Sequence, residues 1–139
     1  MEKQNPEYIV IHSTTESNIL FAEMNYNVEP TKIIVLKKYS EPTRHCSVTG
    51  TYIHPKCRNS NSVGVQLYAH TNEYISETVE NRAAELVANL MIICDIPIEN
   101  VLRHYDVTHK HCPELYVSKP ERWSNFKDLV LDYYDQLSE

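Results

Sequence analysis

The sequence has little positive charge and no long apolar run. Its 139 residues include 13 Lys and Arg against 19 Asp and Glu, a formal charge of −6 at pH 7. Nonspecific nucleic-acid binding needs a positive field facing the phosphates, so this balance argues against nucleic acid as a partner. No stretch reaches the roughly 18 apolar residues that indicate a membrane-spanning helix, and we expect no membrane insertion.

The N-terminus also lacks the pattern of a secretory signal. Such a signal needs a basic start followed by an apolar stretch of roughly 7–15 residues. The apolar residues at 9–11 form too short a run and are better explained as part of a strand. We therefore expect synthesis in the cytoplasm without a signal peptide.

Four cysteines are present, but a chain of this length does not need disulfides to be stable. Cys94 falls on the apolar side of a helical pattern and is predicted to be a small buried hydrophobe. Cys46 and Cys57 lie in a predicted loop, where a disulfide between them is an open alternative. Cys112 belongs to a different pattern, described below.

Predicted strands and helices interleave along the chain, which indicates an α/β domain. The clearest helix covers residues 76–94, where apolar residues recur at helical spacing opposite a polar side, and Pro97 marks its end. The other expected elements are strands at 7–13, 32–36 and 62–68, one or two helical turns within 14–24, a loop over 41–61, an extended segment at 101–106 and an amphipathic helix over 123–137.

Three polar features accompany these elements. His12 ends the first predicted strand, at the edge of the sheet where α/β proteins usually build sites. His104 and Cys112 are eight positions apart in a predicted loop, and imidazole nitrogen and thiolate sulfur are ligands that Zn²⁺ favours. The third feature is the polar segment 59–66, which enters a strand. Each feature alone is compatible with a purely structural role.

The motifs in question read Ile-Val-Ile-His-Ser-Thr at 9–14, Asn-Ser-Val-Gly-Val-Gln-Leu at 61–67 and Arg-His-Tyr-Asp-Val-Thr-His-Lys-His-Cys-Pro at 103–113. Together they resemble the zinc-dependent N-acetylmuramoyl-L-alanine amidases of the type 2 family, in its phage-lysin and autolysin branch. That family shares a fold with the peptidoglycan recognition proteins. The resemblance implies a single catalytic amidase domain over residues 1–139, with a central mixed β-sheet flanked by helices.

By this resemblance, His12, His104 and Cys112 bind one Zn²⁺ per chain. Three protein ligands leave a fourth position for water, as in catalytic zinc sites. Zinc lowers the pKa of bound water to about 7 and polarises the amide carbonyl. The resemblance also implies that Lys110 is catalytic and stabilises the oxyanion, and that Tyr26 assists the zinc-bound water.

The same comparison implies substrate contacts at His45, Asn61 and Gln66, with His45 either touching substrate or carrying a proton. Gln66 departs from the family, in which many members have Glu, and Gln cannot act as a general base. His109 replaces a common Gly of the last motif. The segment 14–24 is shorter than its counterpart in the family.

Several neighbours of His104 are candidates for roles around the metal. Tyr105 and Asp106 are expected to orient the His104 ring, with plain packing as an equal alternative for Tyr105. His109 and His111 add two further imidazoles, which offer alternative zinc ligands.

The leading functional hypothesis is hydrolysis of the amide bond between N-acetylmuramic acid and L-alanine in peptidoglycan. The expected protein is a monomer that acts on the cell wall after release, as a phage or prophage endolysin does. One alternative is a non-catalytic peptidoglycan-binding module of the same fold, in which the Cys ligand is typically missing, so Cys112 argues against it. Another is a protein in which zinc is purely structural, which would unfold on chelation.

Overall fold

The computed structural model describes residues 3–17, 23–46 and 51–139. Its strands form one mixed sheet with the order β3-β2-β4-β1-β5. Strand β1 pairs parallel with β4 and β5, β2 pairs parallel with β4, and β3 pairs antiparallel with β2. The strands are β1 (Tyr8–Thr14), β2 (Tyr26–Val28), β3 (Ile33–Val35), β4 (Ser62–Tyr68) and β5 (Val101–Arg103).

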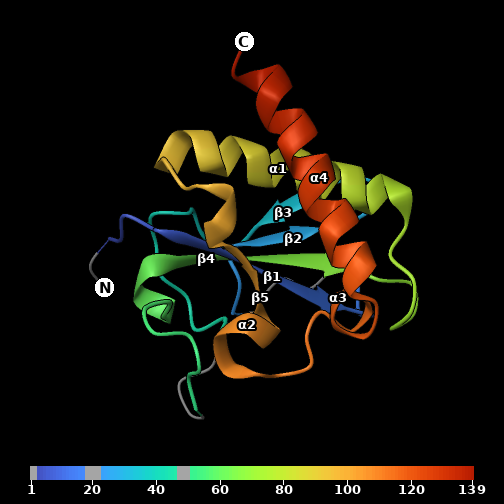
Figure 1. Ribbon diagram of the computed structural model, residues 1–139, viewed down its shortest axis with the longest axis horizontal. Helices are drawn as coiled ribbons and strands as arrows, with labels where there is room; N and C mark the ends of the chain where they lie inside the picture. The colour runs from blue at the N-terminus through green and yellow to red at the C-terminus, as the bar shows by residue number, and fades with distance from the viewer. Residues whose placement is uncertain (1–2, 18–22, 47–50) are drawn as a thin grey trace.

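Helices cover both faces of this sheet. Figure 1 shows α1 and α4 together on one side of the sheet and α2 on the other. The helices are α1 (Glu77–Cys94), α2 (His104–Thr108), α3 (Glu114–Ser118) and α4 (Pro120–Leu137), with short 3-10 turns η1 (Asn59–Asn61) and η2 (Ile98–Asn100). Across the described ranges, no helix has the length and apolar character needed to cross a bilayer.

The ends of α1 follow from local chemistry. The Ser76 hydroxyl accepts a hydrogen bond from the Val79 backbone N–H at 3.2 Å, which satisfies a donor that the first helical turn leaves free. At the other end Asp95 adopts a left-handed conformation, with φ 56°, and its N–H donates to the Met91 carbonyl. Ile96 and Pro97 then lead the chain away from the helix.

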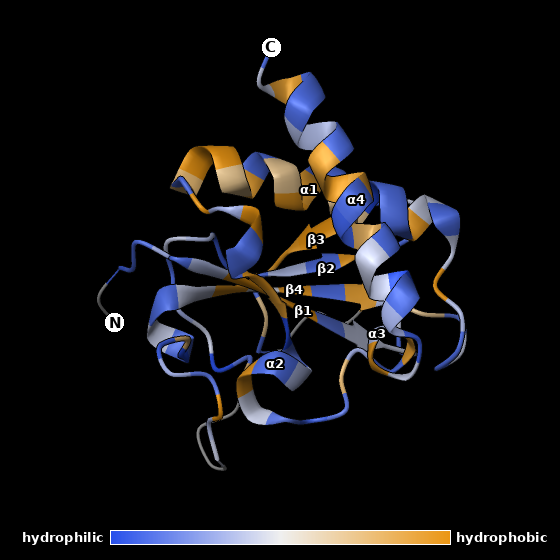
Figure 2. Ribbon diagram, viewed as in Figure 1, coloured by the Kyte–Doolittle hydropathy of each residue, from blue (hydrophilic) through white to orange (hydrophobic). Residues whose placement is uncertain are grey.

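Alternate residues of the central strands belong to different apolar clusters. Ile9 and Ile11 of β1 are fully buried in the larger cluster, with α1 and α4. Tyr8 and Val10 belong to a smaller cluster that includes Val107 of α2. This alternation is the ordinary consequence of a strand, in which successive side chains point to opposite faces. Figure 2 shows the strands and α1 rich in hydrophobic residues and the loops largely hydrophilic.

Most of the predicted elements are confirmed. The strand at 62–68 has the predicted bounds, and the predicted helices correspond to α1 and α4. The predicted extended segment at 101–106 is wrong in its second half, because α2 begins at His104. The expected helical turns within 14–24 lie partly outside the described residues, and the described residues 15–17 and 23–24 are not helical.

Candidate metal centre

His12, His104 and Cys112 lie together in the folded chain. Their nearest candidate ligand atoms, one from each side chain, all lie within 4.8 Å of one another. His12 and His104 are buried, with exposed fractions of 1% and 3%, and their ring centroids are 4.8 Å apart. Two imidazoles and one thiol form a donor set suited to Zn²⁺, and three protein ligands leave one position for another ligand. The residues present therefore fit a catalytic zinc ion.

Parallel pairing brings these residues together across a large distance in sequence. In the β1–β5 register, Ile11 lies opposite Arg103, so the next residues come side by side: His12 within β1 and His104 at the start of α2. Cys112 returns to this point through the loop after α2, where the Tyr105 backbone N–H donates to the Cys112 carbonyl at 3.0 Å. This backbone hydrogen bond holds Cys112 next to the start of α2, beside His104.

Burial keeps both imidazoles of the donor set neutral. Burial, together with His45, His104 and Lys110, lowers the pKa of His12 well below its usual range. Burial and Lys110 lower the pKa of His104 to about 4. A neutral imidazole offers the lone pair that a metal needs.

Cys112 is subject to opposing influences. Burial raises the pKa of the Cys112 thiol, whereas the Ser13 backbone N–H and the Lys110 ammonium group lower it. Both of these groups favour the negatively charged thiolate, which is the form that binds a metal. Lys110 is exposed, yet its charge acts on all three members of the donor set. It is therefore placed to stabilise negative charge that develops beside them.

Asp106 does not orient His104, and this prediction is wrong. Its carboxylate accepts hydrogen bonds from the Arg103 backbone N–H at 2.9 Å and from the Arg103 guanidinium at 3.1 and 2.7 Å. Arg103 also donates to the Tyr116 carbonyl at 3.1 Å. Tyr105 packs its ring on that of His109, with centroids 4.5 Å apart. The start of α2 is therefore held by Arg103, and Tyr105 takes the packing role.

His109 occupies a backbone position that favours glycine. It caps the C-terminal end of α2 with φ 70°, in the left-handed region. Residues with a Cβ pay a steric penalty there that glycine does not. His111 is exposed and pairs with the Glu114 carboxylate. In the described residues, neither His109 nor His111 belongs to a group that could hold a metal.

His45 contacts the donor set through the His12 ring. Its side chain is buried, and its Nδ1 is 3.0 Å from Nε2 of His12. Its Nε2 is 2.8 Å from the Ser62 hydroxyl, and burial lowers its pKa to about 3. The Sγ of Cys46 is 3.4 Å from the same His45 Nδ1, and His12, His45 and Cys46 form a second group that could hold a metal.

Tyr26 is not brought to the donor set. It lies next to Asn27 on β2, but its ring packs in the larger apolar cluster, on the α1 face of the sheet. Its hydroxyl accepts a hydrogen bond from the Tyr39 backbone N–H at 3.1 Å. The neighbouring Asn27 points to the opposite face, where its side-chain oxygen accepts from Nε2 of Gln66 at 3.1 Å.

Of the three predicted substrate contacts, Gln66 lies on the central strand β4, beside His12. Gln66 pairs with His12 in the β1–β4 register. The space beside Gln66 is too narrow to admit a water molecule, and it is bounded by Thr14, Glu16, Asn27, Val28, Glu29, Gln66 and Tyr68. Asn61 instead accepts a hydrogen bond from the Arg58 backbone N–H at 2.7 Å and donates to the Lys56 carbonyl at 3.0 Å. Its side chain holds the turn that precedes β4.

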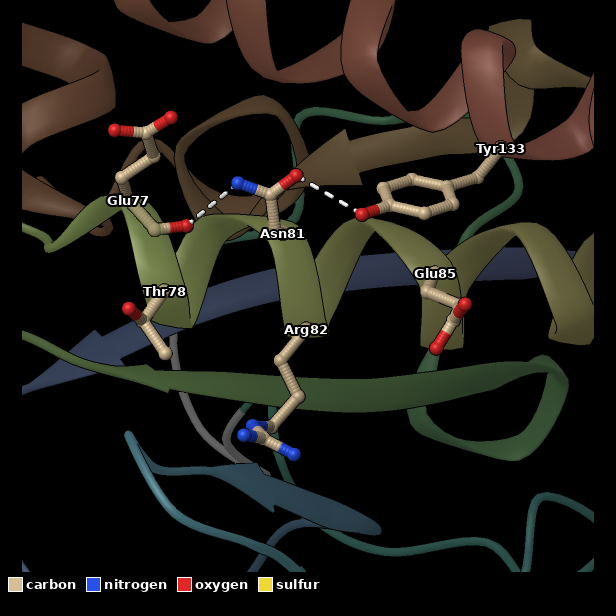
Figure 3. Close-up of a pocket in the computed structure, with 6 residues that line it drawn as sticks. All are labelled: Glu77, Thr78, Asn81, Arg82, Glu85 and Tyr133. Carbon is tan, nitrogen blue, oxygen red and sulfur yellow. Dashed lines mark hydrogen bonds between the residues drawn. The ribbon is translucent and has the colours of Figure 1, made fainter.

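A larger surface depression lies away from the donor set. It has a volume of about 470 Å³ and is lined by Glu77, Thr78, Asn81, Arg82, Glu85 and Tyr133. Figure 3 shows the Tyr133 hydroxyl donating to Asn81, and the Asn81 amide donating to the Glu77 carbonyl, both at 2.9 Å. It lies between α1 and α4, contains no His or Cys, and brings no metal ligands together.

Sequence reasoning missed two of the residues behind the donor set. Cys46 follows His45 directly, so a His-Cys pair was a visible signal, but the pair lies in a predicted loop. Ser62 precedes the motif glycine, Gly64, and gave no signal of its own. The four cysteines are free, so the alternative of a Cys46–Cys57 disulfide is wrong.

Comparison with curated proteins identifies amidases as relatives of this chain. A 73-residue stretch is 40% identical to the N-acetylmuramoyl-L-alanine amidase CwlL of Bacillus licheniformis, covering 52% of this chain and 20% of that protein. A 71-residue stretch is 35% identical to the N-acetylmuramoyl-L-alanine amidase BlyA of Bacillus subtilis, covering 50% of this chain and 19% of that protein. The match spans about a fifth of these relatives' length. No protein-family model matches the chain.

Comparison with solved structures confirms the predicted fold. The PlyG catalytic domain superimposes with a TM-score of 0.77 and 23% identity, over 95% of this chain and 84% of that one. This likeness extends over nearly the whole chain, so it includes the segments that the sequence comparison leaves out. The expected resemblance and the α/β architecture with a central mixed sheet are thereby confirmed.

Proposed function

We propose that this chain, a relative of the N-acetylmuramoyl-L-alanine amidases in sequence and fold, hydrolyses the amide bond between N-acetylmuramic acid and L-alanine in peptidoglycan. The observation that carries this proposal is the convergence of His12, His104 and Cys112 within 4.8 Å. We further propose that residues 1–139 act as one catalytic domain, as a monomer, on the cell wall after release from the cytoplasm.

In this proposal, His12, His104 and Cys112 hold one zinc ion. When bound, zinc supplies Lewis-acid activation of water and of the scissile carbonyl. The neutral imidazoles suit this role because their protons are already lost at neutral pH. The backbone N–H of Ser13 supports the thiolate form of Cys112 by donating a hydrogen bond to its sulfur.

Lys110 is assigned to charge stabilisation in the transition state. Its ammonium group acts electrostatically on all three donor residues, so it lies within range of the reacting carbonyl in this site. A cation fixed there lowers the energy of the oxyanion that forms as water attacks. Tyr26 is left out of this mechanism, since its hydroxyl lies on the other face of the sheet and bonds to Tyr39.

The stem peptide is proposed to pass along the sheet at Gln66, which pairs with His12 in the β1–β4 register. Gln66 donates a hydrogen bond to the Asn27 side-chain oxygen at 3.1 Å, which fixes the orientation of the Gln66 amide beside His12. Amide groups bond well to a peptide backbone because each carries both donors and an acceptor. Gln66 is therefore a substrate contact in this proposal, and not a base.

Digestion of purified peptidoglycan followed by mass spectrometry tests the function. The zinc-loaded protein should release stem peptides with a new L-alanine amino terminus. Cys112→Ser should lower this release by more than about 100-fold and also lose the zinc. Cys94→Ser is the matched control, because Cys94 lies on α1 away from the donor set, and it should keep both properties.

Lys110→Ala separates catalysis from metal binding. It should retain zinc and lower the rate roughly 100-fold, as expected for loss of a group that stabilises an oxyanion. Lys37→Ala, at an exposed lysine near β3, should be neutral. Intact peptidoglycan despite one bound zinc per chain would overturn the amidase and favour a binding module.

A further inference from the structure

The hydrogen bonds of His45 determine which of its ring nitrogens carries the hydrogen. The Ser62 hydroxyl lies 2.6 Å from the Arg58 carbonyl, to which it donates its only hydrogen. The same Ser62 oxygen is 2.8 Å from Nε2 of His45, so it acts there as an acceptor. His45 therefore carries its hydrogen on Nε2, and its Nδ1 presents a lone pair.

That lone pair faces His12. Nδ1 of His45 is 3.0 Å from Nε2 of His12, so in this pair His12 donates. A neutral His12 with hydrogen on Nε2 keeps its own lone pair on Nδ1. A continuous chain of hydrogen bonds thus runs from His12 through His45 and Ser62 to the Arg58 backbone.

The position of the His45 ring is set by the backbone of β4. A Cβ built on Gly64 would lie 2.6 Å from Cγ and 2.8 Å from Cβ of His45. The ring therefore packs directly on a strand residue that has no side chain. Only glycine leaves this space, so the ring can approach β4 closely enough to reach both Ser62 and His12.

We propose that His45 is a positioning residue that holds His12 in the Nε2–H tautomer and so makes Nδ1 of His12 its metal ligand. This assignment rests on the zinc site proposed above. It also explains why the ion belongs with His104 and Cys112 rather than with Cys46. Nε2 of His45 donates to Ser62, and its Nδ1 faces Nε2 of His12 at 3.0 Å and the Cys46 thiol at 3.4 Å, so His45 has no lone pair left for a metal.

Two substitutions at His45 distinguish positioning from packing. In His45→Asn, the side-chain oxygen is attached to Cγ, as Nδ1 is in histidine, and can still accept from His12. In His45→Leu, the volume is largely kept but the acceptor is lost. We expect His45→Leu to weaken zinc binding by about 10–100-fold in a chelator competition, and His45→Asn to recover most of that loss.

Nuclear magnetic resonance of the metal-free parent protein tests the tautomer directly. Long-range ¹H–¹⁵N correlation of ¹⁵N-histidine-labelled protein should show Nε2–H for both His12 and His45. Zinc should then perturb Nδ1 of His12. An Nδ1–H tautomer of His12 would overturn the proposal, and this measurement decides it even where His45→Leu fails to fold.

The outcomes separate this inference from the proposed function. Absence of zinc binding in the parent protein would remove the proposed zinc site, and with it the role of His45. Zinc binding by the parent together with equal affinity in folded His45→Leu would overturn the role of His45 and leave the zinc site intact. With cobalt in place of zinc, the thiolate charge-transfer band should disappear in Cys112→Ser and persist in Cys46→Ser.

Discussion

The two faces of the sheet are built from the same strands but have opposite characters. On the α1 and α4 face, β1 contributes Ile9 and Ile11, both fully buried among apolar neighbours. On the α2 face, the same strand contributes Val10 and then His12, and β4 contributes Gly64. One face is thus apolar throughout, whereas the other combines a small apolar cluster with the polar site.

This difference shows how a small chain supports a buried polar cluster. Burying unpaired polar groups costs free energy, and the α2 face offsets that cost with hydrogen bonds from His12 through His45 to Ser62. The opposite face has continuous apolar contact between the strands and two long helices. The apolar face therefore supplies the stability on which the site depends.

The largest expected effect on stability comes from the apolar face. Phe126 of α4 is 1% exposed and packs against Tyr116 and Trp123, with ring centroids 5.4 and 5.9 Å away. Phe126→Ala should lower the free energy of unfolding by about 3–5 kcal/mol, measured by urea denaturation. Leu137→Ala, at a half-exposed position of the same helix, should have little effect. A parallel loss of zinc affinity in folded Phe126→Ala would show that the faces are not independent.

Acid should destabilise the metal-free protein through the other face. The folded pKa is about 3 for His45 and about 4 for His104, both below the ordinary value of 6.5. The unfolded chain therefore binds more protons, and stability falls as the pH drops below 6.5 toward 4. Each imidazole should cost about 2 kcal/mol at pH 5 relative to pH 8.

Urea denaturation at several pH values measures this loss. His104→Gln should reduce the proton uptake on unfolding at pH 5 by about one proton. His70→Gln, at an exposed imidazole, provides the control. A stability that is constant between pH 8 and 5 would contradict the burial of neutral imidazoles in the site.

Alanine substitutions at two neighbouring positions of β4 should have different consequences, because the two side chains lie on opposite faces of the sheet. Gly64→Ala places its Cβ 2.6 Å from the His45 ring, so it should cost roughly 1–3 kcal/mol and also weaken zinc binding. Val65→Ala, one residue along and on the other face, should cost roughly 1–3 kcal/mol through lost packing and leave zinc affinity unchanged. Calorimetric titration with zinc compares them, and equal zinc affinities would contradict the proposed packing of His45.

The smallest expected effect concerns the end of α2. His109 has a φ of 70°, so His109→Gly removes a steric penalty but loses the contact with the Tyr105 ring. The two changes nearly cancel, and we expect a gain in stability below about 1 kcal/mol. His109→Ala keeps the penalty and loses the ring, so it should be less stable than His109→Gly by about 1 kcal/mol. The same thermal stability in both variants would contradict this account.

Sequence patterns were sufficient for the long elements and for the grouping of the donor residues. The helical spacing of apolar residues predicted α1 and α4, and the alternation at 62–68 predicted β4 with its bounds. The three-residue strand β2 was missed because Asn27 interrupts its apolar residues, whereas the equally short β3 is a continuous Ile-Ile-Val run. The predicted grouping of His12, His104 and Cys112 agrees with the geometry, while their role as zinc ligands stays a prediction.

The order of residues along the chain did not reveal on which face of the sheet each polar side chain lies. Tyr26 was expected beside the metal, yet the strand places it on the α1 face and places Asn27 on the other. One residue of register exchanges the two faces of a strand, so a motif match alone leaves the direction of a side chain undecided. Likewise, Asp106 was predicted to orient His104, but at the start of α2 its carboxylate accepts hydrogen bonds from Arg103.

Residue types and their spacing were enough to predict the α/β class, the apolar periodicity of the main elements and the candidate donors among His and Cys. These follow from residue type and spacing, which act locally. Three relations become visible only in the folded chain: His45 contacts His12, Gly64 leaves room for the His45 ring, and Tyr26 lies on the opposite face. Those relations depend on parallel strands that are distant in sequence, and their register is fixed only when the whole sheet packs.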